Sequence, residues 1–176
     1  MQAVDICKAN KDSFGEVQSF YHSLIDNLNP ERRYVGWKKE VYPSSEFLRT
    51  SIDKGCLYIC RDKRRIAGAM VLNHEYNKSY KNCRWHTAAD DSELLVIHAL
   101  GVHPDFNGKG YAKALVRDAI DVAGKSGMKA IRLDVLEGNI PAENLYAGFG
   151  FVYIDTVQMY YDDTGWTNFK LYEFRI

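Results

Sequence analysis

The sequence predicts a mixed α/β fold in which helices flank one central sheet. Two observations carry this prediction. The first is the apolar run from Leu94 to Val102, which is followed by a proline-marked turn, a glycine-rich loop and a helical pattern from Ala112 to Ala123. The second is the alternating run from Lys129 to Val135, because a strand, a helix and a strand in that order form a parallel crossover unit.

The length favours a single domain over residues 1–176. A chain of 176 residues suffices for one sizeable core and is short for two. Hydrophobic residues make up 46% and charged residues 26%, which is typical of a globular protein in water. Lys plus Arg and Asp plus Glu are 23 each, whereas proteins that bind nucleic acid or anionic membranes usually carry a basic excess. We therefore expect neither of these partners.

The expected compartment is the cytoplasm. The N-terminal segment MQAVDICKANKD lacks the apolar core of a secretion signal, and no run approaches the roughly 18 apolar residues of a membrane span. The cysteines show no paired metal-ligand spacing, and Cys56 and Cys60 lie in an apolar, strand-like run that suits buried thiols. We expect a reduced protein without a metal centre.

Two helices and a hairpin are predicted before the central strand. Apolar residues recur at helical spacing after Asp12, and Asn29-Pro30 ends that pattern. Pro43-Ser44-Ser45-Glu46 indicates the start of a second helix. The polar segment from Arg61 to Arg65 separates two strand-like runs. The expected bounds are 12–28 and 43–53 for the helices, 56–60 and 66–72 for the strands, and 73–92 for a loop.

A short helix and two strands are predicted after the crossover unit. Its long helix ends near Gly124 and Gly127. Gly138-Asn139-Ile140-Pro141 opens a short helix that runs to about Gly148, since proline is tolerated in a first turn. The last strands are expected at 150–157 and 167–174, separated by a turn at 162–165.

The glycine-rich loop predicts a site for a phosphate-bearing ligand. A strand, a loop and a helix start place free backbone N–H groups where the helix dipole favours an anion. The P-loop pattern is absent, because Gly108-Lys109-Gly110-Tyr111 has neither its spacing nor its hydroxyl. The dinucleotide fingerprint also fails, because Lys113 stands where a third small residue is needed.

The loop resembles the acetyl-CoA loop of the GNAT superfamily of N-acetyltransferases. That family shows V-x-P-x-[FY]-[RQ]-G-x-G-x-[GA], and the residues from Val102 to Ala112 are VHPDFNGKGYA. A second family block, L-x-V-x-x-x-N-x-x-A-x-x-x-Y-x-x-x-G-F, is met in full between Leu133 and Phe151. Its matching residues are Leu133, Val135, Asn139, Ala142, Tyr146, Gly150 and Phe151. The resemblance covers about 93–151.

The resemblance implies a GNAT-like fold in which the parallel strands ending at Val102 and near Leu136 splay apart and hold the arm of acetyl-CoA. A glycine inside a strand is costly unless backbone or ligand approaches closely, so Gly101 fits this position independently. The family's Arg or Gln is Asn107 here, and because backbone N–H groups do most of the binding, we expect binding to survive. The implied acetyl-CoA contacts are Leu100, Gly101, Val102, Asn107, Gly108, Lys109, Gly110, Tyr111, Ala112, Asn139, Ala142 and Tyr146.

The implied reaction is transfer of the acetyl group to a primary amine by direct attack. The amine must lose a proton, and the departing thiolate benefits from gaining one. The resemblance assigns the second task to Tyr146. His98 lies in an apolar strand and has a suitable pKa range for the base, while Glu93, acting through water, is the alternative.

The acceptor is expected to be a small molecule or a peptide or protein amine. Arg33, Trp37 and Tyr42 are the candidate acceptor wall, suited to a carboxylate or an aromatic ring. Two alternatives to an enzyme stay open, namely a non-catalytic acyl-CoA-binding or sensing domain on the same fold and a nucleotide-binding protein. A homodimer is compatible with the resemblance.

Overall fold

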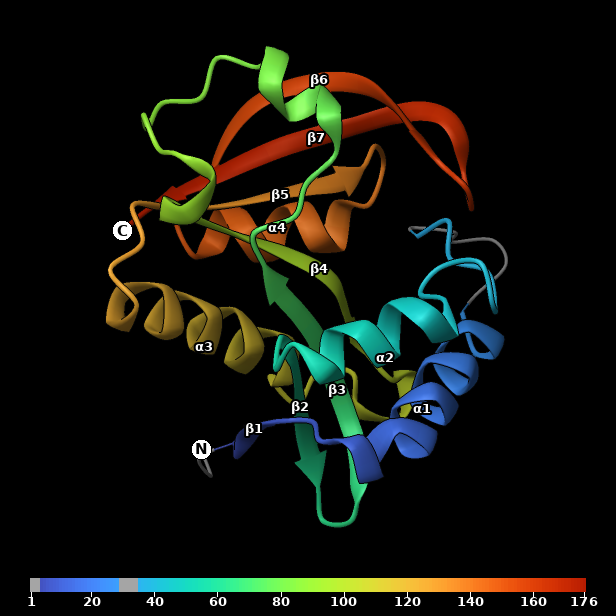
Figure 1. The fold of residues 1–176 in the computed structure, drawn as a ribbon. Coiled ribbons are helices and arrows are strands. Elements are labelled where there is room, and N and C mark those ends of the chain that lie inside the picture. Colours follow the sequence, from blue (N-terminus) through green and yellow to red (C-terminus); the bar gives the residue numbers. More distant parts are fainter. Residues whose placement is uncertain (1–3, 29–34) are drawn as a thin grey trace.

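The computed structural model describes residues 4–28 and 35–176. Seven strands in this part of the chain form one sheet in the order β1-β2-β3-β4-β5-β7-β6 (Figure 1). The strands are β1 Ile6–Lys8, β2 Leu57–Asp62, β3 Arg65–Asn73, β4 Leu94–Val102, β5 Ala130–Leu136, β6 Val152–Tyr161 and β7 Gly165–Arg175. Of these strands, β4 and β5 pair in parallel, and the other neighbours are antiparallel. The predicted mixed sheet with a parallel pair is confirmed.

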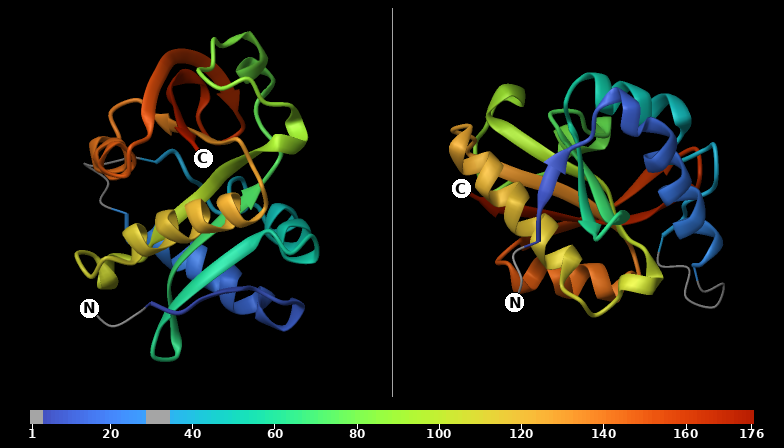
Figure 2. Two further views of the ribbon diagram at one scale, coloured as in Figure 1. Left: turned by 90° about the vertical axis from the view of Figure 1, so that its left-hand side faces the viewer. Right: turned by 90° about the horizontal axis from the view of Figure 1, so that it is seen from below.

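Helices cover both faces of the sheet (Figures 1 and 2). The α-helices are α1 Phe14–Asp26, α2 Ser45–Asp53, α3 Tyr111–Lys125 and α4 Ile140–Gly148. The 3₁₀ turns are η1 Lys11–Ser13, η2 Lys78–Asn82, η3 Asp91–Glu93 and η4 Pro104–Phe106. α1 and α2 pack on one face and α3 and α4 on the other. No helix among the described residues is long and apolar enough to cross a membrane.

The helical periodicities in the sequence identify the faces that are buried. α3 buries Leu115, Val116, Ala119 and Ala123 against the sheet, and α1 buries Val17, Phe20, Tyr21 and Leu24 on the opposite side. These residues recur at spacings of three and four, which places them on one stripe of each helix. The sheet is therefore sandwiched between two apolar cores.

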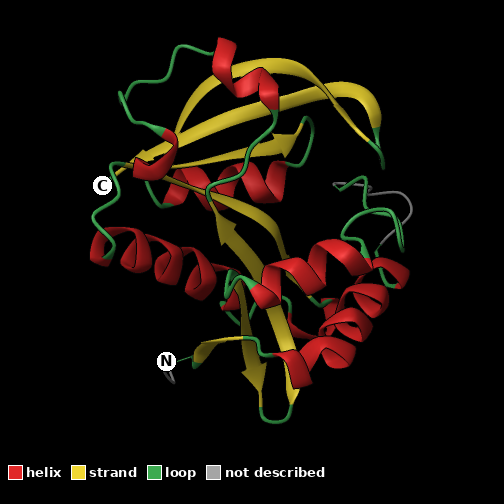
Figure 3. Cartoon of the chain, in the orientation of Figure 1, coloured by secondary structure: helices red, strands yellow, loops and turns green. Residues whose placement is uncertain are grey.

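Several boundaries differ from the sequence predictions. β1 was not predicted, because three residues are too few to show an alternation, and it pairs with the edge of β2. β6 extends to Tyr161 and β7 begins at Gly165, so the last two strands form a long hairpin that arches over one end of the molecule (Figure 3). β6 is an edge strand with much of its surface exposed, which hides its alternation.

The parallel pair separates part-way along its length. β4 and β5 pair at Leu94, Leu95 and Val96 of β4, and no pairing is found between these two described strands beyond Val96. One extra residue of β4 then faces β3 at a bulge near Ala99, whose φ is 48°. The hydroxyl of Tyr21 on α1 donates a hydrogen bond of 2.8 Å to the carbonyl of Ala99. The predicted splay is thus present, and α1 holds the bulge beside it.

A buried ion pair fixes the loop that precedes β4. Arg132 Nε lies 2.9 Å from Glu173 Oε2, and the side chains are 7% and 3% exposed. Arg132 also donates to the carbonyl of Thr87, whose own N–H donates to Glu173. The segment predicted as a loop is therefore tied to β5 and β7.

Replacing Arg132 by methionine is expected to lower the free energy of unfolding by about 3–5 kcal/mol, because Glu173 would stay buried and unpaired. Urea denaturation measures the loss. Lys11→Met is the matched control, since Lys11 pairs with Asp53 in an exposed bridge worth about 0–1 kcal/mol. Equal losses of unfolding free energy in the two variants would contradict the stabilising role of the buried Arg132–Glu173 pair.

Candidate active site

A cavity of about 370 Å³ opens where β4 and β5 part. Five stretches that are distant in the sequence contribute to its wall. Its lining includes Trp37 and Tyr42 from the segment before α2, Glu75 from the loop after β3, His98 and Leu100 from β4, Asp134 from β5, Asn139, Ala142 and Tyr146 from the start and body of α4, and Asp163 from the β6–β7 turn. The cavity is therefore a product of the tertiary fold.

His98 and Asp134 face each other across the gap between the strands. Val96 is level with Arg132 in the last paired position, so continuing that register places His98 level with Asp134. Burial lowers the pKa of His98, and the negative charge of Asp134 opposes part of that effect. His98 is therefore neutral near neutral pH and able to accept a proton.

The hydrogen bonds of His98 define which ring nitrogen is free. Its Nε2 lies 3.0 Å from Asn73 Oδ1 and 2.9 Å from the carbonyl oxygen of Glu75. Asn73 Oδ1 already accepts the N–H of Glu75 at 2.9 Å, so the amide oxygen is the atom that faces the ring. Two acceptors at Nε2 assign the proton to that nitrogen. The lone pair of the neutral imidazole is then on Nδ1, the nitrogen that can take up a proton.

Asp134 is a polar residue of the cavity wall that the sequence analysis missed. The hydroxyls of Tyr80 and Tyr161 donate to its Oδ2 at 2.7 and 2.9 Å. Burial raises the pKa of Asp134, while these hydrogen bonds and His98 act in the opposite direction. The sequence did contain a signal for this residue. Arg132 and Asp134 occupy alternate positions of a strand whose other positions are apolar, which indicates that both lie on the same face of the sheet.

α4 places Asn139 and Tyr146 on the same cavity. Asn139 caps the helix by accepting the N–H of Ala142 at 3.2 Å, and it also lines the cavity. The ring of Tyr146 packs edge-on against that of Phe151, with the two ring centroids 5.4 Å apart. Its hydroxyl has no hydrogen-bond partner among the described residues, and burial raises its pKa above the ordinary range. Tyr146 therefore stays protonated and can donate.

The glycine-rich loop at the start of α3 presents free N–H groups. Gly108 and Gly110 have φ angles of 76° and 87°, a conformation that favours glycine. The first helical hydrogen bond runs from the N–H of Ala114 to the carbonyl of Gly110. No acceptor for the N–H groups of Gly108 and of residues 110–113 is found in the described parts of the chain. This arrangement suits an anion.

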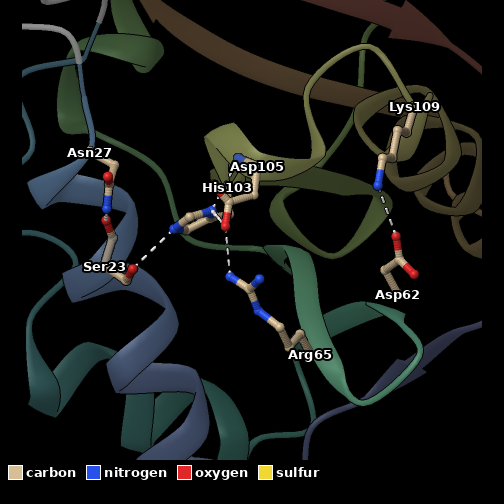
Figure 4. A network of polar contacts seen from close by, with 7 residues as sticks. All are labelled: Ser23, Asn27, Asp62, Arg65, His103, Asp105 and Lys109. Carbon is tan, nitrogen blue, oxygen red and sulfur yellow. Dashed lines mark hydrogen bonds and ion pairs between the residues drawn. The ribbon is translucent and has the colours of Figure 1, made fainter.

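Polar contacts hold the loop against α1 and the β2–β3 hairpin (Figure 4). His103 Nε2 contacts Ser23 Oγ at 3.0 Å, and its Nδ1 accepts the N–H of Asp105. Arg65 pairs with Asp105 at 2.9 Å, and Lys109 pairs with Asp62 at 3.2 Å. Lys109, one of the implied acetyl-CoA contacts, is thus paired with a carboxylate.

The comparison with protein families decides the family. Residues 20–151 match the model of the acetyltransferase (GNAT) family. The chain belongs to this family. Solved structures show the same fold along the whole chain. A putative acetyltransferase from Staphylococcus aureus Mu50 is 22% identical with a TM-score of 0.70, covering 97% of both chains. Arabidopsis thaliana NAA60, solved in complex with acetyl-CoA, is 17% identical with a TM-score of 0.71, covering 98% of this chain and 99% of its own.

Curated relatives of this GNAT protein match only in part. An uncharacterized N-acetyltransferase of Methanocaldococcus jannaschii is 26% identical over 126 residues, which are 68% of this chain and 52% of that protein. The [ribosomal protein bS18]-alanine N-acetyltransferase of Haemophilus ducreyi is 31% identical over 99 residues, which are 53% of this chain and 65% of that protein. The chain thus spans about half to two thirds of the length of these relatives.

The fold of this GNAT protein brings seven of the 17 predicted site residues together in the cavity. His98, Leu100, Asn139, Ala142 and Tyr146 share the cavity. Trp37 and Tyr42 of the predicted acceptor wall also line it. The loop residues 107–112 lie apart from these, at the start of α3. Arg33 falls outside the described residues.

Two predicted residues have surroundings that differ from the expectation. Glu93 does not line the cavity, because its carboxylate binds Lys129 at 2.7 Å and accepts the N–H of Asp90 in a capping box before β4. At Gly101, an added Cβ would lie 2.8 Å from Leu24 and 3.1 Å from Trp37. Side chains of α1 and of the segment before α2 therefore approach this glycine closely.

Proposed function

We propose that this GNAT protein is an N-acetyltransferase that moves the acetyl group of acetyl-CoA to a primary amine by direct attack. The observation that carries the proposal is one cavity lined both by a histidine whose Nδ1 and by a tyrosine whose hydroxyl have no hydrogen-bond partner among the described residues. A base and an acid on the same cavity are what the two proton transfers of this reaction need. The acceptor amine belongs to a small molecule, a peptide or a protein.

The structure has groups that fit acetyl-CoA. The free N–H groups of Gly108 and of residues 110–113 suit its pyrophosphate. The edge of β4 that faces β5 has no strand partner at Leu100 and Val102, so backbone groups there are open to the pantetheine amides. Asn139, Ala142 and Tyr146 complete the wall near the gap. When bound, acetyl-CoA supplies the thioester that the amine attacks.

The proton transfers divide between two residues. His98 Nδ1 accepts the proton that the attacking nitrogen gives up, while Nε2–H stays bonded to Asn73 and Glu75. Tyr146 donates its proton to the sulfur as the C–S bond breaks and the C–N bond forms. The products are an N-acetylated amine and the free thiol of CoA. His98 and Tyr146 return to their starting forms by exchanging the proton with solvent.

Thiol release from acetyl-CoA over a broad panel of amines tests the function. We expect release that depends on the amine and is matched by an acetylated product.

One observation favours a second function, a non-catalytic acyl-CoA-binding or sensing domain. The family's longer Arg or Gln is Asn107 here, so the loop departs from the family pattern at this position. Tight binding of acetyl-CoA by calorimetry, with no turnover of any amine, would support that second function.

Asn73→Asp is expected to move the acid limb of the kcat profile to higher pH by about one unit or more, because a carboxylate beside Nε2–H stabilises the charged imidazolium. The charges already facing His98 are Asp134 on β5 and Glu75 beyond β3. The introduced carboxylate would still accept the N–H of Glu75, so the geometry is conserved. The pH dependence of kcat measures the shift.

Asn82→Asp is the control, since it adds the same charge at an exposed position away from the cavity. If the acid limb of the kcat profile lies at the same pH in Asn73→Asp as in the wild type, His98 is not the group that titrates.

A further inference from the structure

The cavity is acidic and aromatic. Its described lining includes three carboxylates, from Glu75, Asp134 and Asp163, and neither a lysine nor an arginine. Glu75 is already paired with Lys54 at 2.7 Å. Asp134 receives hydrogen bonds on Oδ2 only, and no partner is found for its Oδ1 within the described part of the chain. Neither Asp134 nor Asp163 therefore has an ion-pair partner among the residues that the structure describes.

Asp163 is buried without a partner from another side chain. It is 7% exposed, and within residues 4–28 and 35–176 no ion pair or side-chain hydrogen bond reaches its carboxylate. Burial raises its pKa and outweighs the backbone N–H groups of Asp163 and Thr164 and the positive charge of Lys38, which act in the opposite direction. The carboxylates of Asp134 and Asp163 both act electrostatically on Tyr42, so Tyr42 lies near each of them. A buried acid aimed into a cavity calls for a positive ligand.

The position of Asp163 is fixed by a close approach between two segments far apart in the sequence. A Cβ added to Gly36 would lie 2.0 Å from Thr164 Cγ2 and 3.7 Å from Asp163 Oδ2. The β6–β7 turn therefore packs directly on the segment before α2. Asp163 is buried at this contact, and water competes less with a charge bound beside a buried carboxylate.

Aromatic rings form the rest of this end. The rings of Trp37 and Tyr42 pack edge-on with their centroids 6.3 Å apart, and the centroids of Tyr42 and Phe47 are 5.4 Å apart. Tyr161 and Phe169 pack edge-on at 5.0 Å. All five rings line the cavity. Aromatic faces together with carboxylates are the chemistry that recognises an organic cation, and neither feature favours an anionic ligand.

We propose that the acceptor is a dication, an amine with a second positive group, whose reacting nitrogen is held between His98 and Asp134 and whose second charge binds beside Asp163 and the rings around Tyr42. This inference rests on the proposed N-acetyltransferase function. It differs from the expectation of an acceptor carboxylate, which rested on Arg33, a residue outside the described part of the chain. The substrate class is a diamine or an amine that carries a guanidinium group.

The test compares acceptors of matched length. Butylamine, 1,4-diaminobutane and 4-aminobutanoate carry the same chain with a neutral, a positive and a negative far end, and diamines with three to six carbons cover other spans. We expect kcat/KM for the best diamine to exceed that of its monoamine by about 10-fold or more, since a hydrogen-bonded charge contributes about one to two decades. The anionic acceptor should be the poorest.

Asp163→Asn should lower kcat/KM for the diamine by much more than it lowers kcat/KM for the monoamine, so that most of the preference for the diamine is lost. Asp162→Asn is the matched control, because Asp162 is the exposed neighbour in the same turn and does not line the cavity. Equal rates for monoamine and diamine, or a preference for the anion, would overturn the proposal while leaving the acetyltransferase function intact.

A separate readout covers the case in which no amine is turned over. Calorimetry should then show 1,4-diaminobutane binding to the wild-type protein and to Asp162→Asn, and binding at least about 10-fold weaker in Asp163→Asn. Binding of this kind without turnover would contradict the acetyltransferase function alone. No diamine binding and no turnover would contradict both.

Discussion

Tyr146→Phe is expected to lower kcat by about 10²–10³-fold on a good amine, because the departing thiolate loses its proton donor. The hydroxyl has no protein partner among the described residues, and burial keeps its pKa high, so removing it leaves no buried group unpaired. The packing of the ring against Phe151 should be unchanged. Steady-state thiol release measures kcat, and calorimetry should show nearly the same affinity for acetyl-CoA.

Tyr153→Phe serves as the control for Tyr146→Phe. Tyr153 is 48% exposed on β6, away from the cavity, and its hydroxyl contacts that of Thr156. Its loss should leave kcat within about a factor of two, as for a surface change. If Tyr146→Phe keeps the wild-type rate, the acid role is wrong.

His98→Gln is expected to lower kcat by about 10²–10⁴-fold at neutral pH. The glutamine amide can still donate to Asn73 Oδ1 and has no lone pair of comparable basicity. In the wild type, burial lowers the pKa of His98, so the base is deprotonated above that pKa and the rate falls only as pH drops below it. The midpoint of the acid limb should therefore lie below 6.5, the ordinary value for histidine.

The pH profile of His98→Gln distinguishes a base from a structural residue. The variant should lose the acid limb and gain rate with rising pH as the free amine becomes deprotonated in solution, near pH 10. His74→Gln is the matched control, since His74 binds the carbonyl of Leu94 and does not line the cavity. A retained acid limb in His98→Gln would transfer the role to another group, and Glu93→Gln would then be the next variant.

The sequence was sufficient for the elements whose signals are local. The bounds of β4 were predicted to the residue, because an apolar run between polar breaks needs no tertiary information. The loop and the α3 pattern followed from glycine positions and spacing. Asn139 and Tyr146 were found because the residues from Leu133 to Phe151 match the second block of the GNAT family.

The parts that escaped prediction depend on register and on distant contacts. Asn73 meets His98 only because β3 and β4 pair with a particular offset, which the sequence does not display. Asp163 reaches the cavity because the β6–β7 turn packs on Gly36. Glu93 lay close to β4 in the sequence, yet a capping box and Lys129 keep its carboxylate at the far end of the strand.

The bulge at Ala99 has a further consequence for which side of the sheet each β4 residue faces. Before it, Leu95 and Ile97 pack towards α3, and after it Leu100 and Val102 do so, whereas His98 and Ala99 both face the opposite side. A regular strand would place Leu100 on the side of His98. Because of this change of side, one strand presents His98 to the face where the amine is proposed to bind. The same strand presents Leu100 and Val102 to the face that α3 covers. Tyr21, far from any reacting atom, holds that change of phase in place.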